Sequence, residues 1–191
     1  MITGISIIIC CYNSVSRIEN TIKHIALQKE VDFLFEVILI DNNSTDKTSV
    51  IAKELFLRYN IANYQIVFES TTGLIYARKC GVLNAKHDIL VFCDDDNWLE
   101  VNYLFNVALG FKTYPDAGIL GSWSEAVFDE NQIVPIWFNS VKECFAVIDK
   151  PSFDRECNFV VGAGMAIRKK IAVAIFNEKF QFIGRKGNLL L

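Results

Sequence analysis

The sequence predicts an α/β fold in which a mostly parallel central sheet carries helices on both faces. Residues 5–11 form an apolar, β-branched run of the kind found in strands that are covered on both faces. Ile18, Ile22 and Ile25 then recur at the spacing of one apolar helix face. Because segments of these two kinds alternate along the chain, we expect parallel strands joined by right-handed helical crossovers.

The same alternation continues to residue 120 and resumes after residue 158. We expect further strands at residues 35–40, 64–68, 88–93, 117–120 and 159–167. We expect further helices around residues 51–59, 72–85, 101–109 and 168–176. Residues 121–158 carry aromatic side chains without a clear period, which favours an irregular, partly β segment that folds over one edge of the sheet.

Composition and charge limit the class of protein. The chain has 191 residues, 52% of them hydrophobic, which suits one domain spanning residues 1–191. A net charge of −3 argues against a nucleic-acid partner, because phosphate binding needs clustered positive charge. No apolar run approaches the roughly 18 to 20 residues of a membrane span, and no secretion signal precedes the first strand, so we expect a cytoplasmic location.

Polar side chains follow three of the predicted strands. Tyr12 and Asn13 come after the first strand, Asp41 and Asn42 after the second, and a run of three aspartates after the fourth. In an open α/β sheet, ligands bind at the carboxyl ends of the strands, near the point where the strand order reverses. We therefore expect one binding site here, although residues 41–45 taken alone would equally suit an ordinary turn and helix cap.

The aspartate run Asp94, Asp95 and Asp96 is the strongest chemical signal. Adjacent carboxylates repel one another and raise one another's pKa, and a divalent cation relieves that cost. If the backbone stayed extended, Asp94 and Asp96 would project the same way and offer the oxygen ligands that Mg²⁺ or Mn²⁺ prefers. The competing interpretation is a solvated acidic turn that caps a helix beginning near Leu99.

Five motifs together resemble the family 2 inverting glycosyltransferases in their order and approximate spacing. They are IIICCYN at residues 7–13, VILIDNNSTDKT at 37–48, GLIYARKCG at 73–81, ILVFCDDDN at 89–97 and GAGMAIR at 162–168. The resemblance covers almost the whole chain and implies the GT-A fold, which has a Rossmann-like sheet. It also implies a nucleotide-sugar-binding half at residues 1–97 and an incomplete acceptor-binding half at residues 98–191.

The resemblance implies a nucleoside pocket at the first two strand ends. Cys10 and Tyr12 would line this pocket, with the ring of Tyr12 stacked on the base. Asp41, with Asn42 beside it, would meet the base or the ribose. The family often has two acidic residues at this point, so Asn42 is a departure that alters the expected contacts with the base.

The resemblance places the remaining donor-binding residues on the third and fourth motifs. Arg78 matches the family's arginine near the nucleotide, while Lys79 stands where an asparagine is usual. Asp94 and Asp96 match the D-x-D motif, so Asp94 would lie near the ribose and Asp96 would bind the metal. Asp95, between them, would lie beside the nucleotide sugar.

The implied reaction is a single in-line displacement that transfers a sugar with inversion. The donor would be a nucleoside diphosphate sugar, expected to be a UDP-sugar, and the cofactor Mn²⁺ or Mg²⁺. The acceptor would be a hydroxyl of a saccharide or a lipid-linked saccharide, as in polysaccharide biosynthesis. Residues 162–165 would approach the acceptor side. Core packing is expected for at least two of Trp123, Trp137 and Phe138, with an aromatic platform for sugar rings as the alternative.

The general base that must deprotonate the acceptor is expected beyond Leu191. Residues 180–191 resemble the run that shortly precedes the acidic base motif of the family, so we expect an amino-terminal fragment of a longer transferase. A missing C-terminal part would allow peripheral association with the cytoplasmic face of the membrane. The alternative function is a nucleotide-binding domain without transfer activity in this truncated form. A D-x-D phosphohydrolase is disfavoured, because that motif normally follows the first strand.

Overall fold

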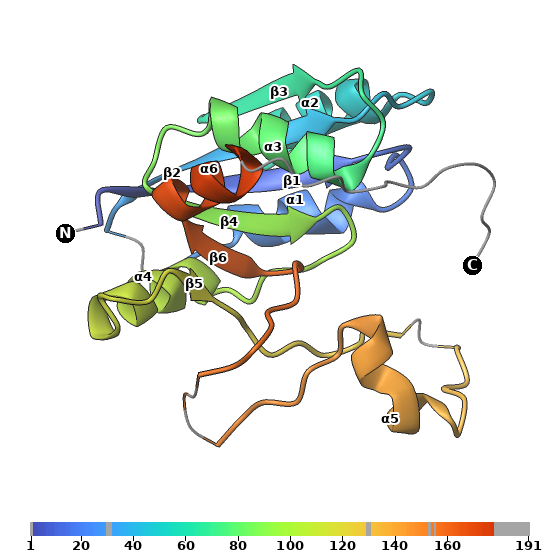
Figure 1. The fold of residues 1–191 in the computed structure, drawn as a ribbon. Helices are drawn as coiled ribbons and strands as arrows, with labels where there is room; N and C mark the ends of the chain where they lie inside the picture. The colour runs from blue at the N-terminus through green and yellow to red at the C-terminus, as the bar shows by residue number, and fades with distance from the viewer. Residues whose placement is uncertain (1, 30–31, 129–130, 153, 155, 178–191) are drawn as a thin grey trace.

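Four neighbouring parallel strands make up one side of a six-stranded sheet in the computed structural model, which describes residues 2–29, 32–128, 131–152, 154 and 156–177. The strand order is β3-β2-β1-β4-β6-β5 (Figure 1). The strands are β1 Gly4–Cys11, β2 Leu34–Asp41, β3 Tyr64–Phe68, β4 Ile89–Asp94, β5 Ile119–Leu120 and β6 Met165–Arg168. The mostly parallel α/β sheet that the sequence predicts is confirmed.

The strand order reverses between β1 and β4. From β1 the chain adds β2 and then β3 on one side, whereas β4 pairs with the other side of β1. The chain therefore moves away from β1 on one side and, after β3, crosses back to the other side of β1, which puts the switch point between the carboxyl ends of β1 and β4. This is the topological position at which open α/β sheets bind ligands.

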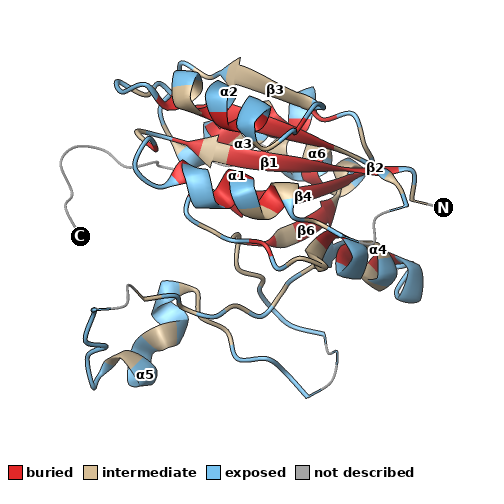
Figure 2. Ribbon diagram, turned by 180° about the vertical axis from the view of Figure 1, so that it is seen from behind, coloured by how far each residue is buried: buried red, intermediate tan, exposed pale blue. Residues whose placement is uncertain are grey.

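Helices cover both faces of the sheet, as Figures 1 and 2 show from opposite sides. Three helices pack on one face: α1 Ile18–Ala26, α2 Thr48–Arg58 and α4 Tyr103–Thr113. Two helices pack on the other face: α3 Leu74–Asn84 and α6 Lys169–Asn177. Most helix and strand bounds lie within a few residues of the sequence-based expectations.

The alternation of side chains along each strand decides which face they stabilise. In β1, Ile5, Ile7 and Ile9 pack under α1 and α2, while Ile8 points to the α3 face. All four isoleucines are fully buried. Each contributes about 1.5–3 kcal/mol to folding by leaving water, so both faces of β1 anchor the strand end that carries Tyr12.

Residues 121–158 leave the sheet after β5 and return to it at β6; we call this segment the arm. Figure 1 shows the arm extending away from the sheet. Its described residues include one short helix, α5 Phe138–Val141, followed by the 3₁₀ helix Lys142–Phe145, and they form no strand. The prediction of a partly β segment over a sheet edge is therefore wrong. The described arm residues pair with no strand of the sheet, and apolar side chains among them stay exposed; Ile136, for example, is 99% exposed.

Two further elements differ from the expectations. The last strand, β6, is shorter than residues 159–167 and runs antiparallel to both β4 and β5. Helix α4 begins at Tyr103, two residues after the expected start. Within the part of the chain that the structure describes, every helix is too short or too polar to span a bilayer.

Candidate functional site

The carboxyl ends of β1, β2 and β4 bring the predicted site residues to one edge of the sheet. In the strand register, Cys10 lies opposite Asp94 and Cys11 lies opposite Asp41. Tyr12 follows directly and is 50% exposed. Tyr12, Asp41 and Asp94 therefore converge, as the strand pattern predicts, while their roles toward a nucleotide stay predictions.

Asp94 and Asp95 contact arginines on opposite faces of the sheet, Arg78 in α3 and Arg17 at the start of α1. Asp94 projects toward α3, where its Oδ1 lies 3.6 Å from Nη2 of Arg78. Burial raises the pKa of Asp94, the guanidinium of Arg78 opposes that rise, and the charges of Asp96 and Asp95 add to it, so the pKa stays above its usual range. A buried carboxyl group with this balance is a candidate for ligand binding.

Asp96 lies in a turn and not on an extended strand. Strand β4 ends at Asp94, and the backbone N–H of Asn97 donates to the Asp94 carbonyl at 3.2 Å. The condition under which Asp94 and Asp96 would point the same way is therefore not met, and Asp96 is exposed. The acidic turn also caps no helix, because α4 begins at Tyr103 without a side-chain cap. The helix-capping part of the competing interpretation is therefore wrong, whereas its solvent-exposed acidic turn is present at Asp96.

The carboxylates at this edge fit a divalent cation that shares its coordination with a nucleotide. Among the described residues, no group of three or more His, Cys, Asp or Glu side chains could hold a metal ion by itself. Mg²⁺ and similar hard cations commonly take only one or two protein carboxylates and complete their shell with phosphate oxygens and water. The exposed carboxylate of Asp96, with Asp94 nearby, suits that kind of site.

Asp95 is held by two residues that the sequence analysis did not single out. Asp95 is a buried residue, with 8% of its surface exposed. Its Oδ1 accepts from Nε of Arg17 at 2.9 Å and its Oδ2 from Nη2 of Arg17 at 2.8 Å. The hydroxyl of Ser14 also donates to Oδ2. The available signal was topological: an arginine just after the first strand lies beside the fourth strand once the order of strands is known.

Asp41 and Asn42 are fixed by different neighbours. The carboxylate of Asp41 accepts the backbone N–H of Ser44 at 3.0 Å and the hydroxyl of Ser49, which lies in α2. The amide of Asn42 faces the other way and ties down the loop after β3. It donates to the carbonyls of Glu69 at 3.2 Å and Thr71 at 2.7 Å, and it accepts the N–H of Gly73 at 2.7 Å.

The Asn42 contacts give a physical reason for the departure from the two-acid pattern. A carboxylate at position 42 could not donate to the two loop carbonyls, whereas the amide satisfies both. Asn42 is 5% exposed, so a lost hydrogen bond there would leave buried polar groups without a partner. Its direct contact with a base stays a prediction.

Arg78 connects the edge at the carboxyl ends of β1, β2 and β4 with the glycine-rich residues 162–164 that lead into β6. Its guanidinium lies over the ring of Phe92, with 5.3 Å from Cζ to the ring centroid. It also packs on Gly162, where a Cβ atom would lie only 2.4 Å from Nη2. Beside it, burial raises the pKa of the Cys10 thiol to about 12. Cys10 is therefore protonated at neutral pH, and its place in a nucleoside pocket stays a prediction.

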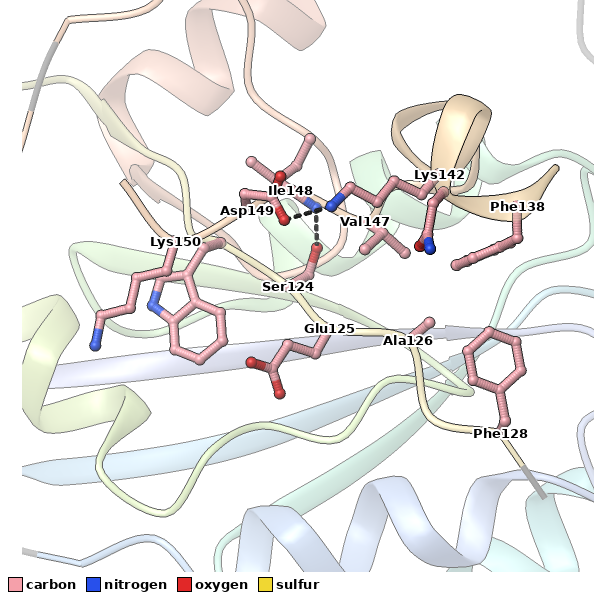
Figure 3. A pocket seen from close by; sticks show the side chains of 12 residues that line it. Ser124, Glu125, Ala126, Phe128, Phe138, Lys142, Val147, Ile148, Asp149 and Lys150 are labelled. Carbon is pink, nitrogen blue, oxygen red and sulfur yellow. Dashed lines mark hydrogen bonds and ion pairs between the residues drawn. The ribbon is translucent and has the colours of Figure 1, made fainter. Parts of the chain in front are cut away.

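A pocket lies within the arm, separate from this edge (Figure 3). Its volume is about 260 Å³. Ser124 closes one side, donating to the Ala146 carbonyl and accepting the Ile148 N–H at 3.1 Å. The lining combines aromatic, acidic and basic side chains: Trp123, Ser124, Glu125, Ala126, Phe128, Phe138, Asn139, Lys142, Val147, Ile148, Asp149 and Lys150.

The three aromatic residues singled out in the arm are not core residues. Trp123 is 39% exposed, Trp137 is 56% exposed, and Phe138 is half-buried. Trp123 and Phe138 line the arm pocket, whereas Trp137 does not. The expectation that at least two of them pack into the core is wrong, because the arm lies outside the sheet and its helices. Residues 180–191, which carry the expected run before the base motif, lie outside the described residues.

Comparisons with known proteins identify the family of this chain. The family model described as Glycosyl transferase family 2 matches residues 6–176. The uncharacterized glycosyltransferase YfnE of Bacillus subtilis is 35% identical over 94 residues, which cover 48% of this chain and 22% of YfnE. The glycosyltransferase AglE of Haloferax volcanii is 31% identical over 102 residues, which cover 50% of this chain and 33% of AglE.

Solved structures share the fold. The crystal structure of S. aureus TarS 1-349 in complex with UDP has a TM-score of 0.58 at 23% identity, covering 69% of this chain and 38% of that one. The mannosyltransferase PcManGT from Pyrobaculum calidifontis, in complex with GDP-Man and Mn²⁺, has a TM-score of 0.64 at 19% identity, covering 90% of this chain and 46% of that one. The chain spans less than half the length of each of these four proteins. The GT-A fold implied by the five motifs is confirmed.

Proposed function

This chain belongs to glycosyl transferase family 2, and we propose that it takes part in transferring a sugar from a nucleoside diphosphate sugar to an acceptor hydroxyl, with inversion and with a divalent cation. The observation that carries the proposal is the acidic turn at the switch point between β1 and β4, where Nη2 of Arg78 lies 3.6 Å from Oδ1 of Asp94. Residues 1–97 would form the donor half and residues 98–191 part of the acceptor half.

The edge at the carboxyl ends of β1, β2 and β4, which we call the donor edge, offers separate partners for each part of a nucleotide sugar. The exposed ring of Tyr12 provides a flat apolar face for the base. Asp41 keeps acceptor capacity for the base or ribose, since each of its oxygens accepts one hydrogen bond from the protein. Asp94 would accept from the ribose. Structures of the same fold contain UDP, UDP-GlcNAc or GDP-Man, which supports a nucleoside diphosphate as the common part of the donor.

The diphosphate carries the charge that the site must stabilise. Asp96 would hold the cation, with Asp94 nearby, and Arg78 supplies a fixed positive charge on the α3 side. When bound, the cation supplies positive charge that stabilises the diphosphate as it leaves. The complex of PcManGT with Mn²⁺ supports a divalent ion for this fold.

Transfer is a single displacement. The acceptor oxygen forms a bond to the anomeric carbon while the bond from that carbon to the diphosphate oxygen breaks, and the electron pair leaves with the diphosphate. The acceptor proton passes to a general base, whose help contributes about 10²- to 10⁴-fold.

The arm pocket is our candidate for the acceptor. Its aromatic side chains Trp123, Phe128 and Phe138 suit the apolar faces of sugar rings, and its charged side chains suit hydroxyl groups (Figure 3). A saccharide or lipid-linked saccharide combines both kinds of surface.

Donor hydrolysis tests the proposed function. The chain is incubated with Mn²⁺ and UDP-glucose, UDP-GlcNAc or GDP-mannose, and NMR follows both nucleotide release and the anomer of the freed sugar. We expect slow release with inversion for one donor, lost in Arg78→Met and kept in Arg58→Met, a surface arginine paired with Glu19. Donor binding without release from a chain extended past the base would favour the nucleotide-binding alternative, and no binding of any donor would exclude both.

A further inference from the structure

The guanidinium of Arg17 bridges the ends of β1 and β4, the two strands between which the strand order reverses. Arg17 lies at the start of α1, on the chain that leaves β1, and its carboxylate partner Asp95 lies at the end of β4. Nε and Nη2 of Arg17 bind the two oxygens of Asp95 at 2.9 and 2.8 Å. This bidentate geometry is the strongest form of a protein ion pair, and Asp95 is nearly buried.

The same guanidinium also fixes the backbone that carries Tyr12. Nη2 donates to the Tyr12 carbonyl and Nη1 to the Asn13 carbonyl, both at 3.0 Å. Asn13 has a φ of 51°, a left-handed conformation that needs support from its surroundings. Its side chain and N–H are held by Thr45 and Ser44. Arg17 thus joins the turn that carries Tyr12 to the acidic turn of β4.

The pairing changes what the aspartate run can offer a cation. Three adjacent carboxylates would all attract a metal ion, yet Asp95 is turned toward the α1 face and already has Arg17 and Ser14 as partners. Asp94 and Asp96 are not bound by Arg17 and remain at the edge between β1 and β4. Arg17 thus cancels one of the three charges, and Arg78, 3.6 Å from Asp94, opposes a second, so both arginines set the local charge left for a cation and a diphosphate.

We propose that Arg17 is the positioning residue of the donor site, which keeps Asp95 away from the cation and holds the Tyr12 turn at a fixed place relative to Asp94 and Asp96. The inference rests on the proposed function, because it needs a nucleoside diphosphate at this edge. Lysine cannot replace Arg17, since one ammonium group cannot bind both oxygens of Asp95 and both backbone carbonyls in the same plane.

Four variants separate the charge from the geometry, with binding measured by calorimetry for UDP in Mn²⁺ and by electron paramagnetic resonance for Mn²⁺ alone. Arg17→Met frees Asp95, so we expect Mn²⁺ alone to bind about threefold more tightly while UDP binds about tenfold more weakly. In the double variant Arg17→Met/Asp95→Asn, the net charge is restored, and Mn²⁺ affinity returns to the wild-type value. Arg17→Lys keeps Mn²⁺ affinity and weakens UDP binding by about tenfold. Arg58→Met is the matched control and changes neither.

A merely structural role would weaken both kinds of binding together, so the opposite shifts in Arg17→Met identify the positioning role. Circular dichroism checks that each variant is folded, and the lysine variant carries the test if the methionine variant is not. Wild-type affinity for UDP in Arg17→Lys, or unchanged Mn²⁺ affinity in folded Arg17→Met, would overturn the inference alone. A wild-type chain that binds neither UDP nor GDP in Mn²⁺ would instead overturn the proposed function.

Discussion

Arg78 packs directly against Gly162, so the donor edge and the approach to β6 share one side chain. The guanidinium touches the position that a Cβ atom of residue 162 would occupy, and it lies 3.6 Å from Asp94 on its other side. Residue 162 therefore controls where Arg78 sits relative to the acidic turn.

Gly162→Ala should weaken nucleotide binding without unfolding the protein. The new methyl group pushes Arg78 away from Asp94, and losing that partly exposed ion pair should weaken UDP binding by about three- to tenfold. Gly121→Ala is the control, because a Cβ atom there meets Val160 and not Arg78. Calorimetric titration with UDP checks the prediction, and equal affinities for the two variants would contradict it.

Asn42→Asp should destabilise the fold, although it restores the acidic residue common in the family. A carboxylate at the buried position 42 cannot donate to the carbonyls of Glu69 and Thr71, so both hydrogen bonds are lost. We expect the free energy of unfolding to fall by about 1–3 kcal/mol in urea denaturation. Asn43→Asp, at an exposed neighbouring residue, should stay within about 0.5 kcal/mol of the wild type. Equal stability of the two variants would show that the amide is not needed.

Glu36 makes the stability of the sheet depend on pH. Burial raises its pKa, but hydrogen bonds from the Lys86 N–H and the Ser6 hydroxyl, together with the Lys86 ammonium, outweigh burial and lower the pKa overall from 4.5. A lowered pKa in the folded state means that ionised Glu36 stabilises the protein above about pH 4.5. That contribution is lost as the pH falls through the lowered folded-state value.

Glu36→Gln tests this dependence. We expect it to lower the free energy of unfolding by about 1–3 kcal/mol at pH 7, with the gap to the wild type closing as the pH is taken from about 4.5 toward 3. Glu54→Gln, an exposed change on α2, serves as the control. A gap that stays constant from pH 7 to pH 3 would argue against the ionised form.

Trp123→Ala should impair the acceptor and spare the donor. Trp123 lines the arm pocket and lies under the ammonium of Lys150, 5.5 Å from the ring centroid. In a transfer assay with a chain extended past residue 191, we expect KM for the acceptor to rise by about tenfold, with UDP affinity unchanged. Ile136→Ala removes an exposed apolar side chain of the arm outside the pocket and should change neither value. Unchanged acceptor KM in the tryptophan variant would place the acceptor elsewhere.

The strands and the position of the donor edge follow from the sequence because they depend on local pattern. Apolar runs such as residues 5–11 identify buried strands, and the polar residues after them mark the edge where ligands bind. The pairing of Arg17 with Asp95 could not be predicted in this way, because it depends on β1 and β4 being neighbours. The bend of the chain after Asp94 was equally hidden, since three aspartates carry no signal that distinguishes a turn from an extended strand.

The arm and β6 were less predictable for a different reason. Apolar residues near residue 165 indicate a strand but not its direction, so the antiparallel pairing with β4 has no sequence signature. The arm's many aromatic residues suggested burial, yet its described apolar side chains lie outside both core clusters. Composition alone therefore does not distinguish a core segment from an exposed one.

The central claim is that the edge between β1 and β4 binds a nucleoside diphosphate through a divalent cation at Asp96. The most direct measurement is calorimetric titration of UDP and GDP into the chain, with Mn²⁺ and with EDTA, for the wild type, Asp96→Ala and the exposed control Asp116→Ala. We predict that one nucleotide binds only with Mn²⁺, that Asp96→Ala weakens this binding by at least about a hundredfold, and that Asp116→Ala leaves it unchanged. Equal affinity of wild type and Asp96→Ala in Mn²⁺ would contradict the account.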